Sequence, residues 1–161
     1  MQSSFSALLG CLLACAVAHA QADHKLNPQT LQNDSTILEQ VIYPAIQQPQ
    51  EPDWQVLRTT IVTRYNDSYA DRNVTKAKIF YFYGKDWAQF STALVKYTQN
   101  YEYKDDLVLM NKNAKMVLNH SQNPADWKAA QGWAKYACEK ETGNAAYKAT
   151  YDALTAKING Q

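Results

Sequence analysis

The sequence predicts an all-α fold of antiparallel helical hairpins, with about seven helices arranged as a short solenoid or an irregular bundle. Two observations carry this prediction. From Asp34 to the end of the chain, apolar residues recur at spacings of three and four, which is the period of an amphipathic helix. The segments between these runs are only two to six residues long, so consecutive helices must pack antiparallel.

Composition supports one globular helical domain over residues 34–161. The chain has 161 residues, of which 46% are hydrophobic and 19% charged, with five Gly and five Pro. These values exclude collagenous, low-complexity and compositionally disordered chains. The formal net charge is +1, so no strong field attracts phosphates, and nucleic acid is not an expected partner.

The first twenty residues have the character of a secretory signal. They contain no charged side chain, and the apolar block 6–18 is followed by Ala18-His19-Ala20, an A-x-A cleavage pattern. The basic residue usual before such a block is missing. The run is too short for a membrane anchor, because about 20 consecutive apolar residues are needed to span a bilayer. We therefore expect export to a secreted or periplasmic location and no transmembrane segment.

Cysteine usage leaves one alternative at this end. Cys11 and Cys15 each follow a Leu-rich triplet that resembles a bacterial lipoprotein box, so a lipid anchor on either one is an alternative that we do not favour. Cleavage after Ala20 leaves Cys138 as the one remaining thiol, so no internal disulfide is expected.

Residues 21–33 show no apolar period and are predicted to be a flexible lead-in. The first helix is expected from Asp34, where Thr36 and Glu39 have the spacing of a capping box. Its wide apolar stripe is interrupted near the end by Pro44.

The second and third helices are expected on either side of residue 66. The second begins around Pro52 and carries apolar residues at the helical period from Trp54 to Tyr65. The third runs roughly from Ala70 to Gly84, which suits a left-handed C-cap. Residues 79–83, IFYFY, could form a strand alone, but a strand without a partner is unstable, so we assign them to the helix.

The last four helices have the clearest signals. Aromatic and apolar residues step by three and four from Trp87 to Tyr101. Asp105-Asp106 favours a helix start electrostatically. Asn123-Pro124 combines an N-cap with proline in the first turn. Gly143-Asn144 provides a stop and a new start, and the final helix ends at Gly160.

An internal echo suggests repeated hairpins. An acidic residue followed by Trp occurs at 53–54, 86–87 and 126–127, which are 33 and 40 residues apart, and a basic residue followed by Tyr comes about three turns after each. This spacing is that of helical-hairpin repeats of the tetratricopeptide kind, in which each hairpin buries its apolar face on the next. Acidic starts and basic ends are also generic complements to the helix dipole, so an irregular bundle remains the alternative.

A family resemblance covers roughly residues 86–159. Trp87, Phe90 and Lys96-Tyr97, the run 110–114 (MNKNA), Ala130 with the run 133–135 (WAK), and the run 150–154 (TYDAL) resemble the helical, tetratricopeptide-like region that follows a thioredoxin-like domain in some bacterial periplasmic proteins. The resemblance implies an interaction or packing module working beside another envelope protein, with a thiol oxidoreductase as a candidate partner. The chain has no Cys-x-x-Cys, so it implies no redox site here.

No strong catalytic or metal-binding motif is present. His24 lies in the lead-in, and His120 follows a predicted helix, where it is more often a favourable cation at the dipole than a general base. No second histidine has metal-ligand spacing and thiol pairs are absent, so we expect no metal and no cofactor. An enzyme using His120 with a carboxylate is the least favoured alternative.

Aromatic residues provide the candidate binding site. Eleven Tyr and four Trp exceed what a small core needs, and amphipathic rings suit a binding groove. The alternative, which the sequence favours, is that these rings pack one hairpin against the next with their hydroxyls in water. The candidates for contact with a partner are Tyr81, Tyr83, Trp133 and Tyr136, with Lys135 and Arg64 for an acidic group. The sequence thus favours an exported, non-catalytic module for protein interaction. The alternative is a small-ligand carrier with an aromatic-lined cavity inside a helical bundle.

Overall fold

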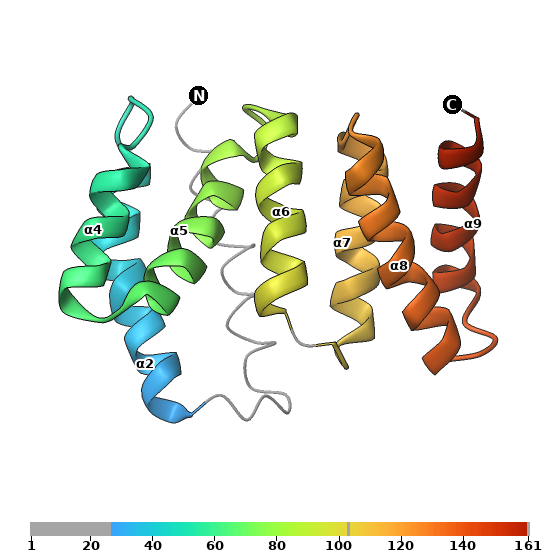
Figure 1. The fold of residues 1–161 in the computed structure, drawn as a ribbon, viewed down its shortest axis with the longest axis horizontal. Coiled ribbons are helices and arrows are strands. Elements are labelled where there is room, and N and C mark those ends of the chain that lie inside the picture. The colour runs from blue at the N-terminus through green and yellow to red at the C-terminus, as the bar shows by residue number, and fades with distance from the viewer. Residues whose placement is uncertain (1–26, 103, 161) are drawn as a thin grey trace.

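The computed structural model describes residues 27–102 and 104–160, and this part of the chain is an all-α array without a strand. Figure 1 shows α4 to α9 side by side along the long axis, with α2 and α4 at one end and α9 at the other. The predicted signal over residues 1–20, the two lipid-anchor candidates Cys11 and Cys15, and residues 21–26 of the lead-in lie outside the described residues.

The first helical rod begins earlier than predicted. Helix α2 spans Pro28–Ile37, and the side chain of Asn27 accepts from the Gln29 N–H as its N-cap. Residues 28–33 of the expected lead-in are therefore helical. Because this start precedes Asp34, the expected capping box does not form, and Thr36 Oγ1 instead donates to the carbonyl of Gln32 over 2.9 Å.

The rod continues through a wider turn. A π-helical segment, η1, covers Leu38–Ile42 and leads into α3, Tyr43–Ile46. The Tyr43 N–H donates to the Leu38 carbonyl, five residues back. The widened turn lies directly before Pro44, which has no N–H to continue the usual ladder.

The next two helices form a hairpin, α4 at Trp54–Arg64 and α5 at Asp67–Phe82. Their N-caps are Asp53 and Asn66, whose side chains accept backbone N–H groups of the first turn. Residues 79–82 are helical, and Gly84 has φ of 73°, so the predicted left-handed end of this helix is confirmed.

The remaining helices have nearly the predicted bounds: α6 is Trp87–Tyr101, α7 is Leu107–His120, α8 is Pro124–Lys140 and α9 is Ala145–Asn159. Their N-caps are the side chains of Asp86, Asp106, Asn123 and Asn144. Each helix packs on the next in sequence, and α6 also contacts α8 while α7 contacts α9.

The internal echo has two different structural meanings. Asp53 and Asp86 are N-caps, so Trp54 and Trp87 are the first residues of α4 and α6. Asp126 instead lies inside the first turn of α8, where it accepts from the Ser121 hydroxyl over 2.7 Å. The third copy of the pattern is therefore shifted within its helix relative to the first two.

The core runs the length of the array. Its fully buried apolar residues come from seven of the described helical segments, as shown by Ile37, Ile42, Ile61, Ala77, Val117, Ala134 and Leu154. Polar contacts attach α2 to α5, because Asp34 Oδ1 accepts from Arg72 Nη2 over 2.7 Å and from Asn73 Nδ2 over 2.8 Å. At the opposite end, Lys157 Nζ on α9 donates to the Leu118 carbonyl over 2.7 Å.

Candidate functional site

A groove of about 580 Å³ runs along α4, α5 and α6 and is open to solvent on one side. We call it the α4–α6 groove. The residues that line it are Trp54, Gln55, Arg58, Asp71, Val74, Thr75, Lys78, Ala88, Gln89, Thr92, Ala93 and Lys96. Side chains from three helices thus converge on one hollow, of a size that binding pockets commonly have.

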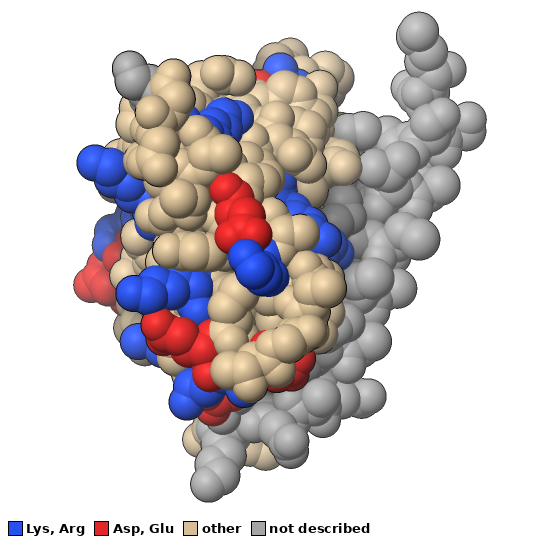
Figure 2. Space-filling view, turned by 90° about the vertical axis from the view of Figure 1, so that its right-hand side faces the viewer, with Lys and Arg blue, Asp and Glu red and all other residues tan. Residues whose placement is uncertain are grey.

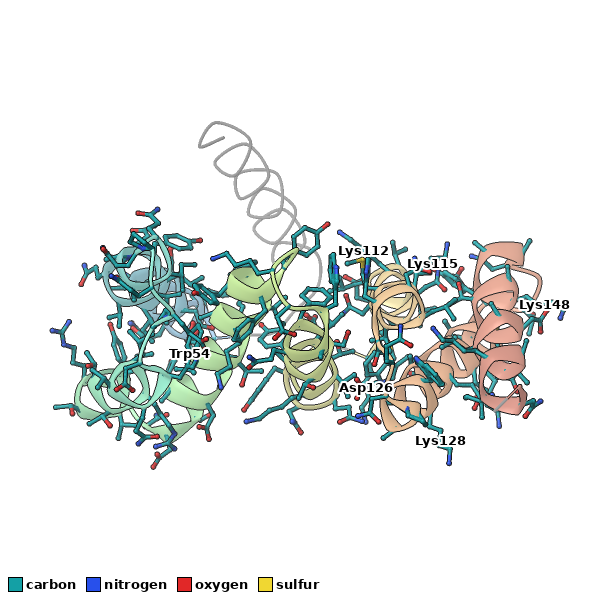
Figure 3. All side chains as sticks on the ribbon, turned by 90° about the horizontal axis from the view of Figure 1, so that it is seen from above. Trp54, Lys112, Lys115, Asp126, Lys128 and Lys148 are labelled. Atoms are coloured by element: carbon teal, nitrogen blue, oxygen red, sulfur yellow. The ribbon has the colours of Figure 1, made fainter. Side chains whose placement is uncertain are left out.

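Trp54 stands at the end of the groove where α4 begins. Its Nε1 donates to Glu51 Oε1 over 2.7 Å, and its ring packs edge-on against Tyr81 with centroids 5.6 Å apart. Lys78 Nζ lies 5.5 Å from the centre of the indole ring. The indole is half-buried, so part of it faces solvent. Figure 3 shows Trp54 between the ribbons of α4 and α5.

Most of the negative charge at the groove is already neutralised. Arg58 Nε bonds Asp71 Oδ1 over 2.9 Å, and Arg58 Nη2 bonds Asp67 Oδ1 over 2.6 Å. The hydrogen bonds to Asp71 and Asp67 raise the pKa of the Arg58 guanidinium. Asp71 is the one carboxylate among the lining residues, so its bond to Arg58 leaves Lys78 and Lys96 as uncompensated charges.

A second group of ionisable side chains lies where α5 meets the end of α6. Burial raises the pKa of the half-buried Glu102 carboxyl to about 7. The carboxylate of Asp106 also raises this pKa, whereas the ammonium of Lys76 lowers it. Burial lowers the pKa of Lys76 and raises that of Tyr97. Because burial moves the pKa values of these groups away from those in the unfolded chain, the stability of the folded region depends on pH.

The structure separates the sequence-predicted partner residues. Tyr81 and Tyr83 lie at the C-terminal end of α5, where Tyr81 is buried and Tyr83 packs edge-on against Trp87 and Phe90. Arg64 is exposed at the end of α4. Because α4 and α5 are antiparallel, Arg64 is at the opposite end of the hairpin from the two tyrosines.

The other three candidates are on α8. Trp133 is buried in the core at 8% exposure, while Lys135 is exposed and lies 3.8 Å from Glu139 in an ion pair within the helix. Tyr136 is half-buried, and its hydroxyl donates to Asp105 Oδ1 over 3.4 Å. Two helices, α6 and α7, stand between this group and α5 (Figure 1), so the six candidates do not meet in one place.

His120, the remaining candidate for chemistry, belongs to an aromatic stack. Its ring lies parallel to Trp87 with centroids 3.7 Å apart, and Phe90 meets it edge-on at 6.5 Å. No hydrogen bond from the described residues reaches its ring nitrogens. The stack joins the C-terminal end of α7 to the start of α6.

The described residues contain no group of three or more His, Cys, Asp or Glu that could hold a metal ion. In the same residues, none of the helices combines the length and the apolar character needed to span a bilayer. Figure 2 shows the end of the molecule formed by α9, where basic and acidic side chains are interspersed.

Comparison of the chain with protein-family models, with curated proteins and with solved structures found no match.

Sequence reasoning did not identify the groove as a site. In the sequence, Trp54 belongs to the internal echo and to an apolar stripe, and Lys96 to the echo and the family resemblance, while no motif includes Arg58 or Lys78. The positions of Arg58 and Lys78 follow from how α4 crosses α5, which no local pattern encodes. The cluster of aromatic and basic residues at helical spacing on α4 was the available signal.

Proposed function

We propose that this chain is an exported, non-catalytic helical module that binds another protein of the cell envelope. The observation that carries the proposal is the α4–α6 groove, because it is open on one side and is lined from three helices by polar groups and the Trp54 ring. Such a surface suits a segment of a partner chain, in which backbone amides and side chains both require partners.

The form of the groove favours this role over that of a small-ligand carrier. A carrier buries most of its ligand in an apolar cavity, whereas this groove is open and has Arg58, Lys78 and Lys96 among its lining residues. The stacking of successive hairpins, with α6 on α8 and α7 on α9, agrees with a tetratricopeptide-like arrangement in the C-terminal half. A thiol oxidoreductase remains the candidate partner that the family resemblance implies.

The groove can be tested by site-specific photocrosslinking in the native host. A photoreactive residue at the exposed position Gln89, inside the groove, should give a discrete adduct with one protein, and Trp54→Ala in the same chain should abolish it. The control places the same residue at Ala149, exposed on α9. Equal adducts at both positions, or none at either, would refute the proposed role of the groove.

Export is tested separately by the mass of the mature protein. We expect an N-terminus at Gln21 in an envelope or secreted fraction, because residues 18–20 have an A-x-A cleavage pattern. A lipid-modified cysteine as the first residue would instead establish the anchored form. An intact Met1 in the cytoplasmic fraction would contradict export.

A further inference from the structure

We infer that the α4–α6 groove binds an extended, acidic segment of a partner protein, whose carboxylates pair with Lys78 and Lys96. This inference rests on the proposed function and specifies the chemistry of the partner. Two observations carry it. The groove has more basic than acidic side chains, and its one carboxylate among the lining residues, Asp71, is already paired with Arg58.

The charge mismatch is local. The lining residues include three basic side chains, Arg58, Lys78 and Lys96, and one acidic side chain, Asp71. Since Arg58 is held by Asp71 and Asp67, its charge is satisfied. Neither Lys78 nor Lys96 has a carboxylate oxygen within 4.0 Å among the described residues. The groove therefore presents two ammonium groups in a chain whose net charge is only +1.

The two lysines come from different helices and face the same hollow. Lys78 is on α5 and Lys96 is near the C-terminal end of α6, whose N-terminal residues Ala88 and Gln89 line the groove further along. Charges at separate points along an open groove fit an extended chain with spaced carboxylates better than a single compact anion. Lys78 also stacks on Trp54, so a bound segment would meet cationic and aromatic surface together.

The polar groups between the charges fit a main chain. Gln55 and Gln89 are exposed on α4 and α6 and carry both donors and acceptors. Such amides can bond the backbone of a peptide without regard to its sequence. Carboxylate placement would then set specificity, and the association rate would fall as salt is added.

The probe is a short fluorescein-labelled peptide of alternating glutamate and glycine, and the reference is the same peptide with serine for glutamate. Fluorescence anisotropy should show the acidic peptide binding at least about tenfold more tightly to the full chain. The double variant Lys78→Glu and Lys96→Glu should lose about tenfold or more of this affinity. Equal binding of the two peptides to the unaltered chain would overturn the inference.

The matched control is Lys112→Glu with Lys115→Glu, which makes the same change in net charge on α7. Both lysines are exposed, and Figure 3 shows them on α7, well separated from Trp54. We expect this control to lose less than about twofold, because charges beyond the Debye length are screened. Equal losses in both double variants would mean that net charge alone drives binding and would overturn the inference.

Two further measurements keep the result decisive. Circular dichroism and thermal unfolding establish that the groove variant folds, and Lys96→Glu alone, which leaves the Lys78–Trp54 contact intact, should still lose affinity. A labelled oligothymidine serves as a non-peptide polyanion, and binding as tight as that of the acidic peptide would reject a protein segment as the occupant.

The inference and the proposed function can fail independently. If the Gln89 photocrosslink persists in the variant with Lys78→Glu and Lys96→Glu, the groove binds a protein but not through acidic groups. If no position in the groove crosslinks at all, the proposed function itself fails.

Discussion

The hairpins α4/α5 and α8/α9 are both pairs of antiparallel helices, but they differ in how tightly their helices pack. In α8, Ala130, Ala134 and Ala137 are fully buried, and Gln131 Nε2 reaches Thr155 Oγ1 on α9 over 2.8 Å. In α4, only Leu57 and Ile61 are buried, and the groove-facing residues include Arg58 and Gln55.

The difference shows how the size of the side chains at a helix contact determines whether that contact forms a packed core or leaves a hollow. Small residues allow two helices to approach closely, and the space between them is filled by a few large side chains. Long polar residues keep part of the contact line hydrated, so a hollow remains. The α8/α9 hairpin therefore contributes stability, while the α4/α5 hairpin borders the hollow at which we propose binding.

The largest expected effect is in the closed hairpin. Leu154 on α9 is fully buried, so Leu154→Ala should lower the free energy of unfolding by about 2–5 kcal/mol through lost burial and the cavity left behind. Urea denaturation followed by circular dichroism measures the change. Val108→Ala on α7 is the control, because Val108 is 64% exposed and should change stability by less than about 0.5 kcal/mol. Equal losses in both variants would contradict close packing of α9.

The second prediction concerns the ionisable group beside α5. Burial raises the pKa of Glu102 from 4.5 to about 7, so the folded chain holds this proton more tightly than the unfolded chain. The free energy of unfolding should therefore fall as pH rises from about 4.5 to about 7, on the order of 2 kcal/mol from this group.

Glu102→Gln should flatten this part of the stability profile, because the amide cannot ionise. Lys76, whose pKa is lowered by burial, contributes with the opposite sign, so the difference between wild type and variant is the quantity to measure. Glu139→Gln, at an exposed position on α8, is the matched control. Identical profiles for wild type and Glu102→Gln would show that the carboxyl is not desolvated.

The third prediction compares the closed α8/α9 hairpin with the α4–α6 groove by enlarging one alanine in each. Ala134→Leu should destabilise by about 1–3 kcal/mol, because α8 has no room for the added atoms. Ala93→Leu on α6 should cost less, under about 1 kcal/mol, because Ala93 borders the open groove and its new methyl groups can extend into it. The reverse order, measured by thermal unfolding, would mean that the groove is as tightly packed as α8.

Much of the fold could be predicted from the sequence because helix ends are encoded locally. Asp86, Asp106, Asn123 and Asn144 are N-caps in the structure, and the last four helices begin beside them as expected. The earlier start of α2 uses the same kind of signal, since Asn27-Pro28 repeats the pattern of Asn123-Pro124. Residues 28–33 lack an apolar stripe, so the helical period alone does not reveal this start.

The candidate site could not be predicted in the same way. An aromatic ring on a helix can be buried, like Trp133 in the middle of α8, or partly open, like Trp54 at the start of α4, and the difference depends on which helices cross beside it. Tyr81 was selected for its polar tip but is covered by Trp54 and Phe82. Lys78 lines the groove only because α4 and α6 pack beside α5 and place their side chains at the same hollow, and the sequence around Lys78 does not encode that packing.

The burial of Asn73 affects how the chain can be produced. Asn73 begins the triplet Asn73-Val74-Thr75, an acceptor sequence for N-linked sugars in secretory pathways that attach them. Its side chain is 1% exposed, and Nδ2, the atom that a sugar would occupy, donates to Asp34 and to the Tyr69 carbonyl. Asn66 begins a second such triplet but is exposed before α5. A glycosylating expression host can therefore reach Asn66, the exposed N-cap of α5, whereas a glycan on Asn73 would keep α2 from docking on α5.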